Sequence, residues 1–138
     1  MFYLKSMNAT VINLCNTIYE QLGPSHNECV YQKALVIELY NHGARSVEYE
    51  KHVPVFFKDT NGTTHTIGSE RVDILAHFPD NIVLLELKAQ TTGIREHTEI
   101  PQLKKYIKGL MVLNIVPTLS MIVNFPQKPV SCIEYFIL

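Results

Sequence analysis

Apolar residues at helical spacing dominate the first third of the chain. In the first segment they are Val11, Leu14, Cys15, Ile18 and Leu22. This period predicts a helix over about residues 6–22, and the Gly-Pro pair at 23–24 ends it. A second helix is expected over residues 25–41, because Ser25 and Glu28 have the spacing of a capping box.

The middle of the chain carries patterns typical of strands. Residues 46–57 form an extended stretch in which Pro54 favours a sheet edge or a bulge. The Asn-Gly pair at 61–62 is a strong hairpin signal. Two further strands are expected over residues 70–78 and 82–89, and the short turn between them requires antiparallel pairing.

The last third is expected to add a helix over residues 99–114 and strands over residues 118–125 and 130–138. The apolar face of this helix consists of Leu103, Tyr106, Ile107 and Leu110. The order of the elements predicts an α/β fold in which a mixed sheet is flanked by helices. With 138 residues, of which 46% are hydrophobic, the chain fits a single domain over residues 1–138.

One predicted core strand contains two opposite charges. Alternate residues of a strand face the same way, which gives two sets: Val83, Leu85 and Leu87 on one face, and Leu84, Glu86 and Lys88 on the other. The first set is fully apolar and is expected to be core. The second set is either the exposed polar face of an antiparallel sheet or a site.

The preceding strand carries an acid at a matching position. Asp73 is flanked by Val72 and Ile74, which point away from it. A tight turn over residues 79–81 lies midway between Asp73 and Glu86, so the hairpin register brings the two carboxylates together across the strands. This proximity favours the site over the exposed polar face.

The two carboxylates would repel each other in a half-buried site and would need a compensating cation. Lys88 supplies one positive charge. A hard divalent cation, with oxygen ligands from both acids and a backbone carbonyl, would supply the rest. Such a metal can activate water and stabilise charge on a phosphoryl oxygen. Lys88 could orient or deprotonate that water, or hold the phosphate.

This constellation resembles the active site of the PD-(D/E)xK nuclease superfamily. Asp73, followed after an apolar strand by Glu86-Leu87-Lys88, matches the family's signature, with Val72 where a proline is usual. The resemblance implies a restriction-endonuclease-like core and a metal-dependent phosphodiesterase site.

The chain is also similar to one branch of that family, the GxxExxY proteins. Glu28 and Tyr31 match an early helix of the branch, with Ser25 at the Gly position. Gln102 and Tyr106, in "QLKKY", match a later Gln-x-x-x-Tyr helix, and "IVNF" resembles the strand that follows it. The resemblance extends over nearly the whole chain.

The resemblance implies roles for individual residues. The expected metal ligands are Asp73, Glu86, the Leu87 carbonyl and Glu28, and the expected catalytic residues are Asp73, Glu86, Lys88, Gln102 and Glu28. Mg²⁺ is the expected cofactor, with Mn²⁺ as an alternative. The expected substrate-binding residues are Tyr31, Lys104, Lys105 and Lys108. The plainer interpretations are a helix cap for Glu28, a packed ring for Tyr31 and a solvated helix face for the lysines.

Composition limits the partners. The formal net charge is −1, so binding to nucleic acid, of which DNA is the favoured kind, must rely on a local patch.

The three cysteines lie far apart and are expected to be buried free thiols in a reducing compartment. The most apolar stretch, residues 109–125, is too interrupted to span a membrane, and no signal peptide is apparent. An intracellular, soluble protein, cytoplasmic or nuclear, is therefore expected.

Three functional hypotheses follow. The first is a metal-dependent nuclease, a hydrolase that cuts phosphodiester bonds, with DNA favoured over RNA. The second is a catalytically inactive module of the same fold that binds nucleic acid or a protein partner. The third is a structure-selective junction resolvase, for which a homodimer with two sites is expected.

Overall fold

The computed structural model describes residues 2–138, and describes side chains from Met7 onward. The helices are α1 (Phe2–Leu22), α2 (Glu28–Asn41) and α3 (Glu96–Val112). The strands are β1 (Ser46–Lys58), β2 (Thr64–His77), β3 (Ile82–Lys88), β4 (Leu119–Asn124) and β5 (Glu134–Ile137). They form one sheet in the order β1-β2-β3-β4-β5, in which only β3 and β4 pair in parallel. The predicted α/β fold with a mixed sheet flanked by helices is confirmed.

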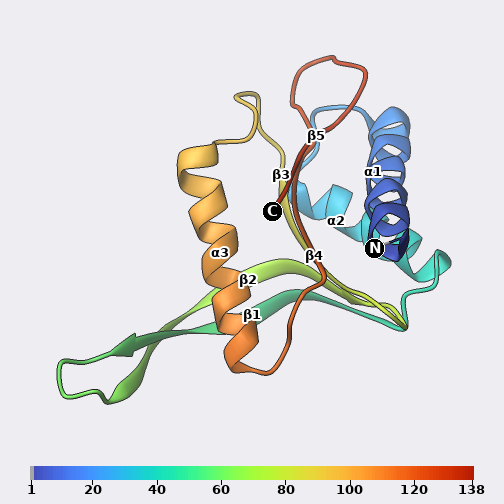
Figure 1. Ribbon diagram of the computed structural model, residues 1–138. Coiled ribbons are helices and arrows are strands. Elements are labelled where there is room, and N and C mark those ends of the chain that lie inside the picture. The colour runs from blue at the N-terminus through green and yellow to red at the C-terminus, as the bar shows by residue number, and fades with distance from the viewer. Residues whose placement is uncertain (1) are drawn as a thin grey trace.

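The helices cover the two faces of this sheet unequally. Helices α1 and α2 lie on one face and α3 lies alone on the other (Figure 1). The larger core cluster contains Val83, Leu85 and Leu87 of β3, and the smaller one contains Leu84 with Leu103 of α3. The predicted apolar face of β3 therefore packs against α1 and α2, while the face that carries the charges lies under α3.

A single glycine lets α3 lie close to β1. A Cβ atom on Gly109 would overlap the Cγ1 atom of Val53 and would lie 3.0 Å from the carbonyl oxygen of Pro54. Any larger residue would force the helix away from the strand, because well-packed interiors leave no room for an added methyl group. Gly109 thus sets the width of the space between α3 and β1.

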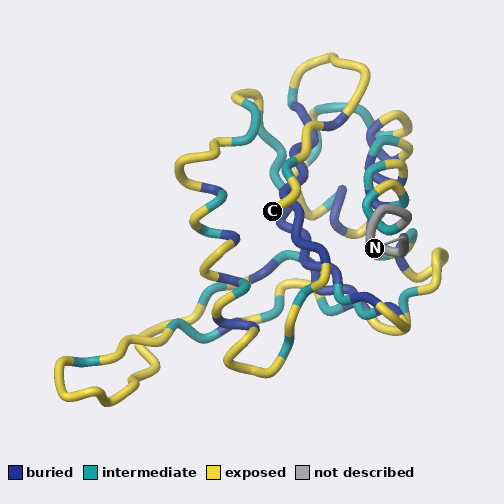
Figure 2. Tube along the Cα trace, viewed as in Figure 1, coloured by how far each residue is buried: buried dark blue, intermediate teal, exposed yellow. Residues whose placement is uncertain are grey.

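The β1–β2 hairpin continues beyond the sheet as a long arm. The arm extends away from the body, and most of its residues are exposed (Figures 1 and 2). It turns through the predicted Asn-Gly pair, where Gly62 has a φ of 84°. The prediction for Pro54 is confirmed, because β1 is an edge strand and its register shifts between Val55 and Phe56.

Several local predictions were wrong. Ser25 does not cap α2: the helix begins at Glu28, Asn27 is its N-cap residue, and Ser25 has a left-handed φ of 77°. The Ser25 N–H donates instead to the side-chain oxygen of Gln127 at 2.8 Å, so a distant loop fixes this turn and no local capping signal reports it.

The element bounds and the cysteines also differ from expectation. Helix α1 begins at Phe2, four residues early, and β2 begins at Thr64 because the hairpin arm extends it. Cys15 is buried as predicted, but Cys29 and Cys132 are exposed. Within residues 2–138, none of the helices combines the length and the apolar character needed to cross a membrane.

Candidate active site

The β2–β3 hairpin brings Asp73 and Glu86 together at the point where the ladder ends. Ile74 pairs with Leu85, the outermost pair in the predicted register, so the next position would place Asp73 opposite Glu86. Beyond it, one carboxylate oxygen of Asp73, Oδ2, accepts the Leu87 N–H at 2.7 Å. A side chain thus replaces the backbone acceptor that a continued ladder would supply, and this fixes the Asp73 carboxylate beside β3.

Glu86 is an unusually buried acid. The residue is 4% exposed, and its Oε1 atom has no hydrogen-bond partner. Its Oε2 atom lies 3.5 Å from the Lys88 Nζ atom and accepts a 3.5 Å hydrogen bond from the Tyr106 hydroxyl. Burial, and then the neighbouring Asp73 carboxylate, raise the pKa of Glu86 to about 9 although Lys88 opposes the shift.

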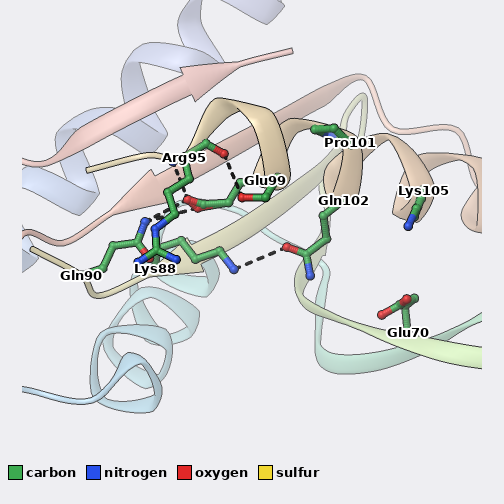
Figure 3. A pocket seen from close by; sticks show the side chains of 9 residues that line it. Glu70, Lys88, Gln90, Arg95, Glu99, Pro101, Gln102 and Lys105 are labelled. Carbon is green, nitrogen blue, oxygen red and sulfur yellow. Dashed lines mark hydrogen bonds between the residues drawn. The ribbon is translucent and has the colours of Figure 1, made fainter. Parts of the chain in front are cut away.

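Lys88 projects into a pocket on the α3 side of the sheet. The pocket has a volume of about 370 Å³, and Gln102, Arg95 and Lys105 are among the residues that line it (Figure 3). The Lys88 amine donates to the Gln102 side-chain oxygen at 3.5 Å. The structure therefore brings together Lys88 and Gln102, two of the expected catalytic residues.

A second hollow opens beside the same acids, toward α2. Its volume is about 510 Å³, and Glu28, Asp73 and Arg71 are among the residues that line it. Glu28 is exposed as a residue, but its carboxyl lies in the hollow and is partly desolvated there. This desolvation, and then the charge of Asp73, raise the pKa of the Glu28 carboxyl. Asp73 thus lines the hollow that contains Glu28, whereas Lys88 lines the pocket that contains Gln102, and Glu86 is buried and lines neither.

Glu99 is a buried acid near the site that was not among the predicted site residues, and it is 5% exposed in the first turn of α3. Its carboxylate accepts hydrogen bonds from the Gln90 side-chain amide at 2.9 Å and from the Arg95 N–H at 2.7 Å. Glu99 therefore ties the first turn of α3 to the chain that leaves β3. The signal was present, because Glu99 precedes Leu103 and Tyr106 at the spacing of the buried face of the helix.

Asn124, at the end of β4, also bonds Gln90, a residue just beyond β3 that Glu99 contacts from α3. It is fully buried, accepts the Gln90 N–H at 3.0 Å and donates to the Gln90 carbonyl oxygen at 3.1 Å. Its amide also donates to Glu134 at 2.7 Å. These bonds fix the backbone two residues beyond Lys88, which limits how far that lysine can move.

Tyr31 does not reach either hollow. Its ring is fully buried and stacks on Phe125 with 4.3 Å between ring centroids. Its hydroxyl donates to the Gly23 carbonyl at 2.7 Å and accepts from the Gln127 amide at 3.1 Å. This position fits the packed-ring interpretation and not the predicted contact with substrate.

The three predicted lysines of α3 are all exposed, but they differ in which hollows they line. Lys105 lines the pocket that contains Lys88, and both Lys105 and Lys108 line the space between α3 and β1. Lys104 lines neither of these, and shares with Lys105 and Lys108 a hollow whose lining residues all come from α3. The structure therefore separates Lys105, next to the site, from Lys104, away from it.

The residues present fit a divalent cation with few protein ligands. Within the described part of the chain, no group of three or more His, Cys, Asp or Glu side chains is placed to hold a metal ion. Two acids are adjacent, however, and the unpartnered Oε1 atom of Glu86 lacks the donor that a buried oxygen requires. Mg²⁺ commonly binds through one or two carboxylates and keeps several waters, which suits this donor set.

Comparison with known proteins identifies the fold and the family of the chain. No curated protein sequence matches the chain. Among solved structures, the crystal structure of SSO0001 is similar, with a TM-score of 0.52 and 15% sequence identity over 94% of this chain. The chain spans 64% of the length of SSO0001, and at this identity the likeness concerns the fold alone.

The family model of the PD-(D/E)XK nuclease superfamily matches residues 5–134. Membership of the GxxExxY branch stays a prediction. Because the match covers nearly the whole chain, the chain belongs to the PD-(D/E)XK nuclease superfamily.

Proposed function

We propose that this protein hydrolyses phosphodiester bonds in nucleic acid with a divalent metal ion, Mg²⁺ or Mn²⁺, and that DNA is its substrate. The observation that carries the proposal is the pair of adjacent carboxylates with a buried, unpartnered oxygen on Glu86. Asp73 lines the α2 hollow and Glu86 is buried beside it. Two adjacent carboxylates of this kind are costly for stability alone, and they suit a cation that a phosphodiester can also contact.

Each residue has a task in this proposal. Asp73, Glu86 and the Leu87 carbonyl would hold the metal, with Glu28 reaching it through water from the α2 hollow. When bound, the metal supplies a nucleophilic water and neutralises charge on the phosphate. Lys88 holds a phosphate oxygen or the attacking water, and Gln102 keeps the lysine amine aimed at the pocket.

The test is cleavage of single-stranded, duplex and branched DNA, and of RNA, by the purified protein. Reactions contain Mg²⁺, Mn²⁺ or a chelator, and are repeated with Asp73→Ala and Lys88→Ala. Matched controls are Asp80→Ala and Lys33→Ala, which remove an exposed acid and an exposed lysine that line neither hollow at the site. Metal-dependent cutting that is lost only in the first two variants is the expected result.

A thermal shift separates the nuclease from an inactive binding module. Binding of a cation to the native state raises the melting temperature through mass action. We expect Mg²⁺ or Mn²⁺ to stabilise the wild type and not Asp73→Ala. No cutting of any substrate, together with no metal-induced stabilisation, would overturn the nuclease and leave the binding module.

A further inference from the structure

A groove between α3 and β1 continues from the pocket that contains Lys88. This α3–β1 groove has a volume of about 340 Å³ and is lined by residues that include Pro54, Val55, Phe56, Lys105 and Lys108. Lys105 and Glu70 also line the catalytic pocket, so the two hollows share a wall and follow one another along α3. Figure 3 shows Gln102 between Lys88 and Lys105, with Glu70 in the same pocket.

The α3–β1 groove offers two kinds of contact. On the helix side, the amines of Lys105 and Lys108 are exposed and carry positive charge. On the β1 side, the surface is apolar and includes Phe56, which is 36% exposed, and the acid Glu70 of β2 lies where the groove meets the pocket that contains Lys88. A charged wall opposite an aromatic surface matches a nucleic-acid strand, whose phosphates seek cations and whose bases stack on aromatic rings.

The same features favour one strand over a duplex. In a duplex, each base face is covered by its neighbours, so a protein ring gains a base face only where a strand is unpaired. The groove volume lies at the low end of pockets that enclose small ligands, and the close approach set by Gly109 keeps it narrow. With only two lysines lining it and a net charge of −1, the protein can neutralise few phosphates outside the site.

We propose that the α3–β1 groove binds a short single-stranded segment next to the phosphodiester that is cut, with Lys105 and Lys108 on its phosphates and Phe56 stacked on a base. The substrate is then a single strand or a frayed end. This inference rests on the proposed nuclease function, since the groove is assigned by its continuity with the catalytic pocket.

The test measures binding separately from cutting. A fluorescein-labelled thymidine 15-mer, alone or annealed in a blunt duplex, is titrated with protein in chelator, and anisotropy reports the dissociation constant at several salt concentrations. The groove variants are Phe56→Ala and Lys108→Ala. Their controls are Phe57→Ala, an exposed ring on the same strand, and Lys33→Ala, an exposed lysine on α2, neither of which lines the groove.

We expect the single strand to bind more tightly than the duplex. Phe56→Ala should weaken binding of the single strand about tenfold through lost stacking. Lys108→Ala should weaken it several-fold and lower the slope of log affinity against log salt by roughly 0.7, the value for one phosphate on a single strand. Circular dichroism and melting curves confirm that each variant is folded.

The remaining outcomes separate this inference from the proposed function. Tighter binding of the duplex, or equal effects of the groove variants and their controls, would overturn the inference even if the protein cuts DNA. Single-strand binding that depends on Phe56 and Lys108, together with no cutting of any substrate and no metal-induced stabilisation, would uphold strand binding by the groove and overturn the nuclease function.

Discussion

The two faces of β3 differ although they alternate along one strand. On the face toward α1 and α2, Val83, Leu85 and Leu87 are at most 1% exposed and are surrounded by apolar residues. On the face toward α3, Leu84 is equally buried, but Glu86 takes the next position and is 4% exposed. The strand is therefore core on one side throughout, and core on the other side only up to Leu84.

The difference shows how stability and function divide along a single strand. Burial of each leucine stabilises the fold by roughly 1.5–3 kcal/mol, whereas burial of an ionised carboxylate opposes folding. The pKa of about 9 for Glu86 shows that its surroundings disfavour the charged form. The continuous apolar face offsets this cost, which lets the other face carry a charged site.

The largest expected effect comes from breaking the apolar face. Leu85→Ala should lower the free energy of unfolding by about 2–5 kcal/mol, because it opens a cavity in the larger core cluster. Urea unfolding gives this value. Metal-dependent cleavage by the folded protein, assayed well below the melting temperature, should change less than twofold.

Leu84→Ala is the matched variant on the other face. Leu84 is as buried as Leu85 but packs with Leu103 of α3, so its loss should cost similar stability and also shift α3 relative to Lys88. We expect cleavage to fall about tenfold or more, since small displacements of positioned groups reduce catalysis steeply. Equal activities of the two variants would show that the faces do not divide the roles in this way.

The second prediction concerns Glu86→Gln without metal. Because the pKa of Glu86 is raised to about 9, the folded state favours the protonated acid. The stabilisation that comes from holding Glu86 protonated is complete below about pH 4.5, where the acid is protonated in the unfolded chain as well. It is lost as the pH rises from 4.5 toward 9, because only the folded state then keeps the proton. At 1.36 kcal/mol per pH unit, the loss between pH 4.5 and pH 7 is about 3 kcal/mol.

In chelator, Glu86→Gln should therefore be more stable than the wild type by about 3 kcal/mol at pH 7, and the gap should close toward pH 4.5. Urea unfolding of the two proteins from pH 4.5 to pH 9 measures the difference in stability at pH 7 and its change with pH. Added Mg²⁺ should stabilise the wild type and not the variant. A gap that does not change with pH would mean that Glu86 is ionised in the folded protein at all these pH values.

Much of this comparison could be predicted from the sequence. The alternation of residues 82–89 placed Leu84, Glu86 and Lys88 on one face, and the turn position gave the hairpin register that the structure has at Ile74 and Leu85. Both inferences rest on the period of two in strands, which is local and exact.

Features set by distant contacts could not be predicted. The turn at Ser25 depends on Gln127, about a hundred residues away, and the buried Tyr31 hydroxyl depends on Gly23 and the same glutamine. Asn124 holds Gln90 across a parallel pair that no turn length fixes. Such pairings follow from tertiary packing, and local patterns do not report them.

The third prediction tests how Lys88 is positioned. Gln102→Ala removes the group that accepts from the Lys88 amine, while the helix surface around it is otherwise unchanged. We expect kcat to fall about tenfold, with KM and the free energy of unfolding nearly constant, since Gln102 is only partly buried and substitutions outside the core usually change the free energy of unfolding by about 0.5 kcal/mol or less.

Thr98→Ala is its control, because Thr98 lines the same pocket but bonds only the Arg95 carbonyl among the described contacts. A higher KM with unchanged kcat in Gln102→Ala would assign Gln102 to substrate binding.

The smallest expected effect separates packing from function at Tyr31. Tyr31→Phe keeps the ring on Phe125 but removes the hydroxyl that bonds Gly23 and Gln127. We expect the free energy of unfolding to fall by about 0.5–1.5 kcal/mol, the usual value of a buried hydrogen bond, with cleavage unchanged. Urea unfolding and a cleavage assay on the same preparation measure both. Loss of cleavage with unaltered stability would instead support the predicted role of Tyr31 in substrate binding. The site would then include the first turn of α2.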